Sequence, residues 1–230
     1  LIAIDVGGWD PPLCVSTLDE GGRKQAIRNV RHAIEVAGKL GCPLVTSHLW
    51  CHPDRGLWSS PGARDPEQEG LYRAAFKASV EDLCPVLDGL GVQMNFMPHP
   101  GGLIEESDPT VDLIRETGCP QVGYTYGIGH SFVIGLPGQD AKTMIDYAGD
   151  TLTHVLISDT NRVDRIIAPP EVKAHEHLVP GRVDVDFRAV LNALKGIGYE
   201  GYLSVHIISE SDRILEAAKE TRAKVEAMLE

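Results

Sequence analysis

The sequence predicts an α/β protein with a parallel sheet, of the kind that forms a β/α barrel. Short apolar strands alternate with helices six times along the 230 residues, and this alternation is typical of parallel sheets. The strands are rich in β-branched residues, as expected when both faces of a sheet are buried. The long loops follow strands, where a barrel carries the residues that do its chemistry.

The first strand–helix unit begins with an apolar strand at residues 1–6 and a loop rich in glycine and proline at residues 7–19. Apolar residues then recur at helical spacing over residues 20–40, which predicts an amphipathic helix. Gly41 follows as a helix end, and residues 43–49 are the next strand.

The second unit contains a long loop at residues 50–65, which has two tryptophans. Residues 66–90 are predicted as a long helix that ends at Gly91, and residues 92–97 as a third strand. A glycine-rich Gly-x-Gly-x-x-Gly turn does not follow the first strand, so a dinucleotide-binding sheet has no support.

The middle of the chain continues the pattern with a helix at residues 109–117 and a strand at residues 122–127. We expect a loop at residues 130–139, a short helix at residues 141–149 and a strand at residues 152–158. The ends of the two neighbouring strands at residues 92–97 and 122–127 would place polar side chains at one rim of the sheet.

The last part starts with an irregular stretch at residues 159–185, which contains three prolines. It is followed by a predicted helix at residues 186–197, a strand at residues 202–207 and a closing helix at residues 209–229. The sequence therefore supplies six strand–helix units, whereas a closed barrel has eight.

Composition limits the classes of partner. The chain is long enough for one large domain, 1–230. Its net charge of −12 argues against nucleic acid as a partner, and its apolar runs are shorter than the roughly 18 residues of a membrane span. Five scattered cysteines favour reduced thiols and a cytoplasmic location.

Four stretches resemble a known family. They are AIEVAGKLGCPLV, VQMNFMPHPGG, GYTYGIGHSF, and THVLISDTNR followed by PGRVDVDFRAVLNALKGIGYEGYLSVHI. The chain is similar over its whole length to the xylose isomerase-like TIM barrels, which include sugar-phosphate isomerases and epimerases and relatives of AP endonucleases. The resemblance implies an eightfold (β/α) barrel. It begins at the third barrel strand, so we expect the first two strands to be missing upstream of Leu1.

The resemblance also implies a divalent metal held by Glu, Asp, His and Glu at four strand ends. The matching positions in this chain are Met97, Gly127, Leu156 and His206. These residues do not suit a hard dication, which prefers oxygen ligands, so we expect no metal cofactor. A divalent ion such as Mn²⁺ or Zn²⁺ is the alternative, because His130, His177 and His206 would suit zinc.

The resemblance assigns roles to several polar residues. His206 stands where the family has a catalytic carboxylate, and His130 matches a histidine that contacts the substrate, so we expect both to be catalytic. We expect four more side chains to bind the substrate: Arg162, His154, His177 and His48. The alternatives are structural. They are a buried, hydrogen-bonded histidine for His206 and for His154, a helix-start or loop role for His130, an ion pair for Arg162 and a solvated loop position for His177.

These residues favour an isomerase or epimerase that moves a proton next to the carbonyl of a sugar-like substrate. One alternative is a carbon–oxygen or carbon–carbon lyase that acts on a keto-sugar. Another is a non-catalytic or ligand-binding barrel that is a subunit of a complex. A phosphodiesterase or DNA-repair enzyme is disfavoured, because the metal cluster and a basic surface are lacking. We expect a homo-oligomer that binds a small molecule and neither nucleic acid nor membrane.

Overall fold

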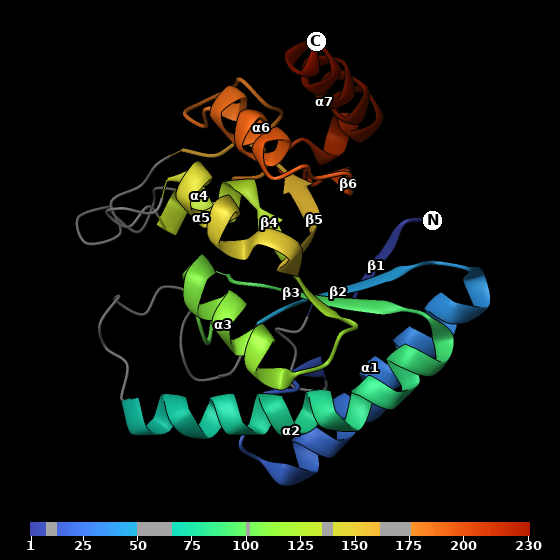
Figure 1. The fold of residues 1–230 in the computed structure, drawn as a ribbon. Helices are drawn as coiled ribbons and strands as arrows, with labels where there is room; N and C mark the ends of the chain where they lie inside the picture. Colours follow the sequence, from blue (N-terminus) through green and yellow to red (C-terminus); the bar gives the residue numbers. More distant parts are fainter. Residues whose placement is uncertain (8–12, 50–65, 100–101, 135–139, 162–175) are drawn as a thin grey trace. The chain divides into compact units, whose positions relative to one another are not determined.

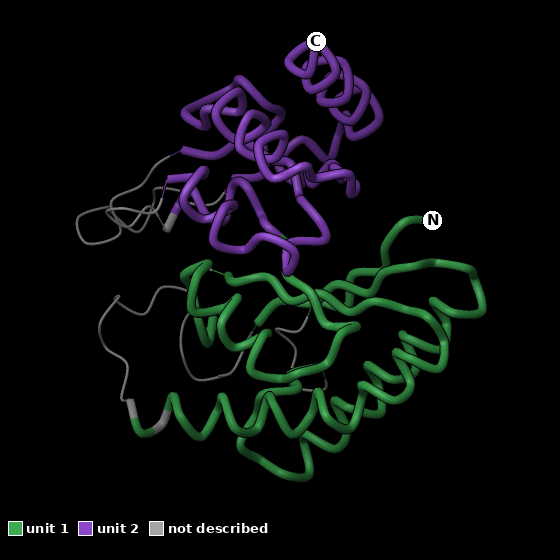
Figure 2. The backbone as a smooth tube through the Cα atoms, in the orientation of Figure 1, with its two compact units in different colours: residues 1–125 green, residues 126–230 purple. Residues whose placement is uncertain are grey.

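The computed structural model describes residues 1–7, 13–49, 66–99, 102–134, 140–161 and 176–230. The chain forms two compact units, Leu1–Thr125 and Tyr126–Glu230 (Figure 2). The strands are β1 (Ala3–Asp5), β2 (Leu44–His48), β3 (Gln93–Met97), β4 (Val122–Gly127), β5 (Leu152–Ile157) and β6 (Tyr202–Val205). The α-helices are α1 (Glu20–Leu40), α2 (Pro66–Leu90), α3 (Ser107–Thr117), α4 (Ile128–Ile134), α5 (Ala141–Ala148), α6 (Phe187–Gly196) and α7 (Ile214–Leu229).

Unit 1 is a parallel sheet with helices on one face (Figure 1). β1 pairs with β2, β2 with β3, and β3 with β4, all in parallel. All residues of β2, which lies between β1 and β3 in the sheet, are buried. Phe76 of α2 packs edge-on against Phe96 of β3, with ring centroids 4.7 Å apart. The helices therefore supply the apolar cover that the sequence pattern requires.

The ends of α1 follow from its sequence. The Asp19 side chain accepts a hydrogen bond from the Gly22 backbone N–H and so caps the first turn. Gly41 ends the helix with φ at 65°, a left-handed conformation that glycine adopts without steric cost. Between the two caps the buried residues are Ala26, Ile27, Val30, Ile34 and Ala37. This is one face of the helix, as the apolar spacing predicts.

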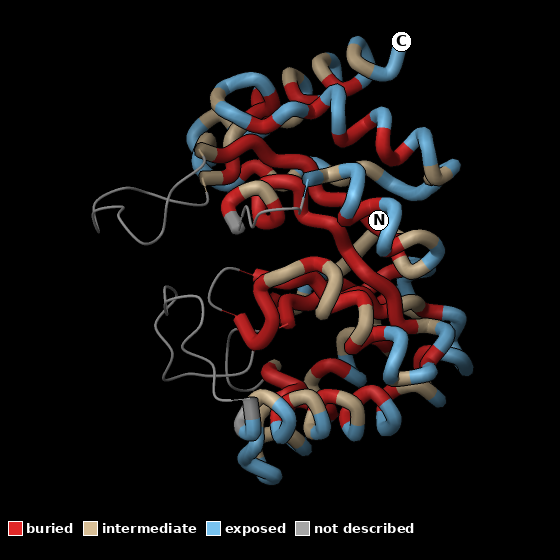
Figure 3. The backbone as a smooth tube through the Cα atoms, turned by 60° about the vertical axis from the view of Figure 1, so that its left-hand side comes forward, coloured by how far each residue is buried: buried red, intermediate tan, exposed pale blue. Residues whose placement is uncertain are grey.

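Unit 2 is built on β5 and β6, which pair in parallel with Ile157 opposite Val205. The Asp186 side chain caps α6 by accepting a hydrogen bond from the Ala189 N–H at 3.0 Å. Buried residues, red in Figure 3, run through the middle of each unit, while the helices alternate between buried and exposed positions. This alternation is what amphipathic helices around a buried sheet produce.

The predicted α/β class with parallel strands is confirmed. Most element boundaries differ from the prediction by one or two residues, and the larger differences lie at α4, at the end of β6 and at the start of α7. His130 does not lie on a loop, because α4 starts directly after β4. β6 ends at Val205, and a short 3₁₀ turn at Ser211–Arg213 precedes α7.

None of the helices in the described ranges is both long and apolar enough to cross a membrane. The single domain 1–230 stays a prediction.

The prediction that the cysteines are free thiols is wrong for two of them. Cys84 of α2 and Cys119, which follows α3, form a disulfide with Cα atoms 6.0 Å apart. Cys14 and Cys42 are free and buried, and Cys51 lies outside the described residues. Spacing alone could not reveal the pair, because the partners are separated by 35 positions and meet only in the folded unit. The cytoplasmic location stays a prediction that the cysteines no longer support.

Reduction of the Cys84–Cys119 disulfide will destabilise the protein. A crosslink that closes a loop of this length restricts the unfolded chain and contributes about 2–4 kcal/mol. We expect dithiothreitol to lower the urea midpoint of the wild type and to leave that of Cys84→Ser unchanged. A wild-type midpoint that does not respond to dithiothreitol, together with no Cys84–Cys119 peptide in a non-reducing peptide map, would contradict the disulfide.

Candidate active site

The carboxyl ends of β5 and β6 lie side by side in unit 2, because the two strands pair in parallel. His206 comes directly after β6, and its backbone N–H donates a hydrogen bond to the Ile157 carbonyl at 2.9 Å. This bond extends the strand pairing by one residue and fixes the backbone of His206. The His206 side chain is half-buried.

His130 also belongs to unit 2 and lies in the first turn of α4. The helix can approach the end of β5 closely because residue 129 is glycine: a Cβ there would lie 2.7 Å from the Ser158 Oγ and 3.2 Å from the Ser158 carbonyl. The next side chain, that of His130, is 1% exposed. The glycine before it is therefore required by packing.

His177 lies on the chain between β5 and α6, in the described segment 176–185, which we name the His177 loop. Its carbonyl accepts hydrogen bonds from the N–H groups of Ile208 at 3.2 Å and Ser209 at 3.3 Å. The backbone of His177 is thus tied to the residues that follow His206.

The side chains of His130, His177 and His206 contact one another, and we name them the imidazole cluster. The ring centroids of His177 and His206 are 4.2 Å apart, those of His130 and His177 5.2 Å, and those of His130 and His206 5.9 Å. The structure thus brings together both predicted catalytic histidines and one predicted substrate-binding histidine. Imidazoles exchange protons near neutral pH, so this cluster is suited to acid–base chemistry.

His154, a further predicted substrate-binding residue, lies inside β5. It is 1% exposed, and its Nε2 is 2.8 Å from the Ser204 Oγ of β6. Burial, and secondarily the charge of His206, lower the pKa of His154 from about 6.5 to about 4. The side chain therefore stays neutral at physiological pH. Its role in substrate binding stays a prediction.

The structure does not test the remaining two predicted residues in the same way. Arg162 lies outside the described residues. His48 belongs to unit 1, where its Nδ1 is 2.9 Å from the Gly7 carbonyl and its ring packs edge-on against His99 at 4.8 Å. Both roles in substrate binding stay predictions.

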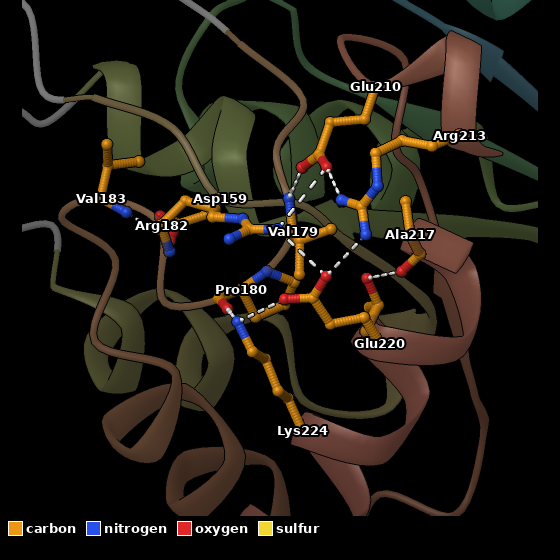
Figure 4. Close-up of polar contacts among 11 residues, drawn as sticks. Asp159, Val179, Pro180, Arg182, Val183, Glu210, Arg213, Ala217, Glu220 and Lys224 are labelled. Atoms are coloured by element: carbon orange, nitrogen blue, oxygen red, sulfur yellow. Dashed lines mark hydrogen bonds and ion pairs between the residues drawn. The ribbon is translucent and has the colours of Figure 1, made fainter. Parts of the chain in front are cut away.

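Sequence reasoning missed Asp159, which is 0% exposed and lies two residues after β5. Its carboxylate accepts four backbone hydrogen bonds, three of them from the His177 loop: from Arg182, Val183 and Val185. Figure 4 shows Asp159 beside Arg182 and Val183. An aspartate directly after an apolar strand was the available signal. Its partners could not be inferred, because they lie more than twenty residues further along the chain.

The sequence profile of the xylose isomerase-like TIM barrels matches residues 5–230. The chain belongs to this family. The predicted barrel fold is supported by a solved structure, that of a D-tagatose 3-epimerase-like protein. The two superpose with a TM-score of 0.73 over 100% of this chain and 79% of the other, at 23% identity.

Two relatives extend the comparison within the family. An uncharacterised protein of Methanocaldococcus jannaschii is 25% identical over 205 residues, which are 89% of this chain and 62% of that protein. The inosose isomerase of Bacillus velezensis is 23% identical over 229 residues, which are 90% of this chain and 70% of that enzyme. The chain therefore spans less than two thirds of the first relative's length.

The residues at the expected metal positions do not fit the hard dication that the family resemblance implies. In unit 1 the position holds Met97, which is 2% exposed; in unit 2 the positions hold Gly127 and Leu156, the latter 8% exposed. Thioether, hydrogen and isobutyl groups supply no oxygen donor. Within the described part of unit 2, the Asp159 carboxylate is already bonded to four backbone N–H groups.

The buried state of His154 makes stability depend on pH. Because its pKa is about 4 in the folded protein and near 6.5 otherwise, the unfolded chain binds a proton that the folded chain excludes between these values. The free energy of unfolding should therefore fall, by about 2–3 kcal/mol between pH 7 and pH 4.

The measurement is urea unfolding at pH 7, 5.5 and 4.5 for the wild type and for His154→Gln, which keeps a polar group near Ser204 but does not titrate. We expect a flatter pH dependence in His154→Gln, whereas His32→Gln, on the exposed face of α1, should behave like the wild type. Equal slopes for the wild type and His154→Gln would contradict the assignment.

Proposed function

We propose that this protein catalyses proton transfer next to the carbonyl of a sugar-like, polyhydroxylated substrate, as an isomerase or epimerase without a metal. The contact among the three imidazoles of unit 2 carries this proposal. The family membership of the chain and its similarity to an inosose isomerase support a sugar-like, polyhydroxylated substrate.

In the proposed reaction, His206 is the base. It is the half-buried member of the cluster, so a substrate can reach it, and an imidazole has the basicity that proton abstraction at neutral pH requires. His206 removes the proton from the carbon beside the carbonyl. The two electrons of the broken C–H bond form the double bond of an enediolate, and the carbonyl oxygen becomes negatively charged.

The charged oxygen needs hydrogen-bond donors, since an enediolate is unstable without them. The ring of His130 stacks on that of His206, with centroids 5.9 Å apart, so a ring N–H of His130 would donate to this oxygen once the substrate has entered the cluster. His177 packs against both and would help to bind the substrate. Return of the proton to the other face of the carbon, after the enediolate turns over in the site, gives an epimer. Return to the former carbonyl carbon, with the hydroxyl proton of the enediolate moving to the charged oxygen, gives an isomer.

The absence of a metal from the reaction is part of the proposal. The oxygen donors that a hard dication requires are missing at the family's positions, so charge stabilisation would fall to hydrogen bonds from imidazoles. Zn²⁺ is the ion that a set of three imidazoles would accept. Chelator treatment therefore distinguishes the two arrangements.

Replacement of His206 should lower kcat for keto-sugar or keto-inositol interconversion. Removal of a general base typically costs about 10²–10⁴-fold, so we expect at least about 100-fold for His206→Gln. Activity is measured with and without a chelator, using His32→Gln as the control. Wild-type activity that is abolished by the chelator, or that survives in His206→Gln, would contradict the proposed mechanism.

A further inference from the structure

The His177 loop is held from two sides by carboxylates that belong to neither the loop nor the imidazole cluster. Asp159 lies beneath one part of the loop, and Glu210, four residues after His206, lies beside another. Figure 4 shows these two residues together with the basic side chains around them. Asp159 lies two residues after the end of β5, and Glu210 lies five residues after the end of β6.

The Asp159 carboxylate is fully used by the backbone. Its Oδ1 accepts hydrogen bonds from the N–H groups of Thr160 at 2.9 Å and Val185 at 3.2 Å, and its Oδ2 from those of Arg182 and Val183, both at 3.0 Å. The Asp159 backbone also exchanges two hydrogen bonds with Leu178, at 2.8 and 3.0 Å. Leu178 is the residue after His177, so these bonds fix the loop next to the cluster.

Glu210 secures the same loop from the β6 side. Its Oε1 accepts a hydrogen bond from the Val179 N–H at 3.2 Å, and its Oε2 pairs with Arg182, at 3.7 Å, and with Arg213. Glu220 of α7 forms ion pairs with Arg182, Arg213 and Lys224, with nitrogen–oxygen distances of 3.0 to 3.2 Å. Lys224 also donates to the Pro180 carbonyl at 2.8 Å. The loop is thereby fastened to the last helix.

Apolar packing completes the arrangement. Val179 of the loop, Ile207 and Ala217 of α7 form one buried cluster, with exposures of 0%, 7% and 0%. Ile207 is the residue after His206, and Val179 is two residues after His177. The chain segments that carry His177 and His206 are thus held together by buried side chains as well as by backbone hydrogen bonds.

We propose that Asp159, assisted by Glu210, is a positioning residue that holds the His177 ring against His206. The expected effect on kcat rests on the proposed function, whereas the expected effect on the position of the His177 loop does not. Neither carboxylate touches the substrate in the scheme above. They act by fixing the loop, and catalytic groups lose much of their effect when they are displaced by about 1 Å.

The test is Asp159→Asn, because asparagine has the same shape but only one acceptor oxygen, so two of the four backbone N–H groups lose their acceptor. The matched control is Asp186→Asn, a cap of α6 at an exposed position, since asparagine caps helices about as well as aspartate. Glu210→Gln is the second variant, for the case that Asp159→Asn does not fold, and exposed Glu216→Gln is its control.

Three readouts are combined. Hydrogen exchange followed by mass spectrometry should show faster exchange across residues 178–185 in Asp159→Asn, and acylation of His177 by diethyl pyrocarbonate should speed up. On an active enzyme, kcat should fall about 10- to 100-fold with KM changed about twofold or less. Glu210→Gln should show the same changes to a smaller degree, and both controls should match the wild type.

Unchanged exchange and unchanged His177 acylation in both variants would overturn the proposal, and so would a loosened loop with wild-type kcat. If the wild type turns over no keto-sugar or keto-inositol, the proposed function fails. The positioning of His177 is then decided by the exchange and acylation results alone.

Discussion

The carboxylate of Asp159 is buried and accepts hydrogen bonds from four backbone N–H groups, three of which belong to the His177 loop. A buried carboxylate is costly unless its oxygens are bonded in this way. The bonds therefore fix the path of the His177 loop at the ends of β5 and β6. The packing of His177 against His206, and the chemistry we propose for the cluster, depend on this path.

Much of the fold follows from local sequence pattern. Apolar spacing with Asp19 and Gly41 defines α1, and the β-branched strands define the parallel sheet. The error at His130 has a clear cause: α4 starts directly after β4, without the loop and capping residues that mark a helix start. The Cys84–Cys119 disulfide and the partners of Asp159 were beyond reach, because both join positions that only the tertiary fold brings together.

The histidines of unit 2 differ in their surroundings, and the difference separates their roles. His154 is buried against Ser204, and its pKa of about 4 keeps it neutral. Its neighbour His206 is half-buried at the end of β6 and contacts two further imidazoles. The sequence assigned catalytic roles to His206 and His130 and left His154 open between substrate binding and a buried, hydrogen-bonded core position. The distinction between a core histidine and a cluster histidine needed the strand register, which places residue 154 inside β5.

The central claim is that an imidazole at position 206 moves a proton beside a carbonyl without help from a metal ion. The most direct measurement is nuclear magnetic resonance of a keto-sugar or keto-inositol panel incubated in D₂O with protein from which metals have been removed. The account predicts deuterium at the carbon beside the carbonyl with the wild type and none above background with His206→Gln. Incorporation that requires added metal, or that is equal in both proteins, would contradict it.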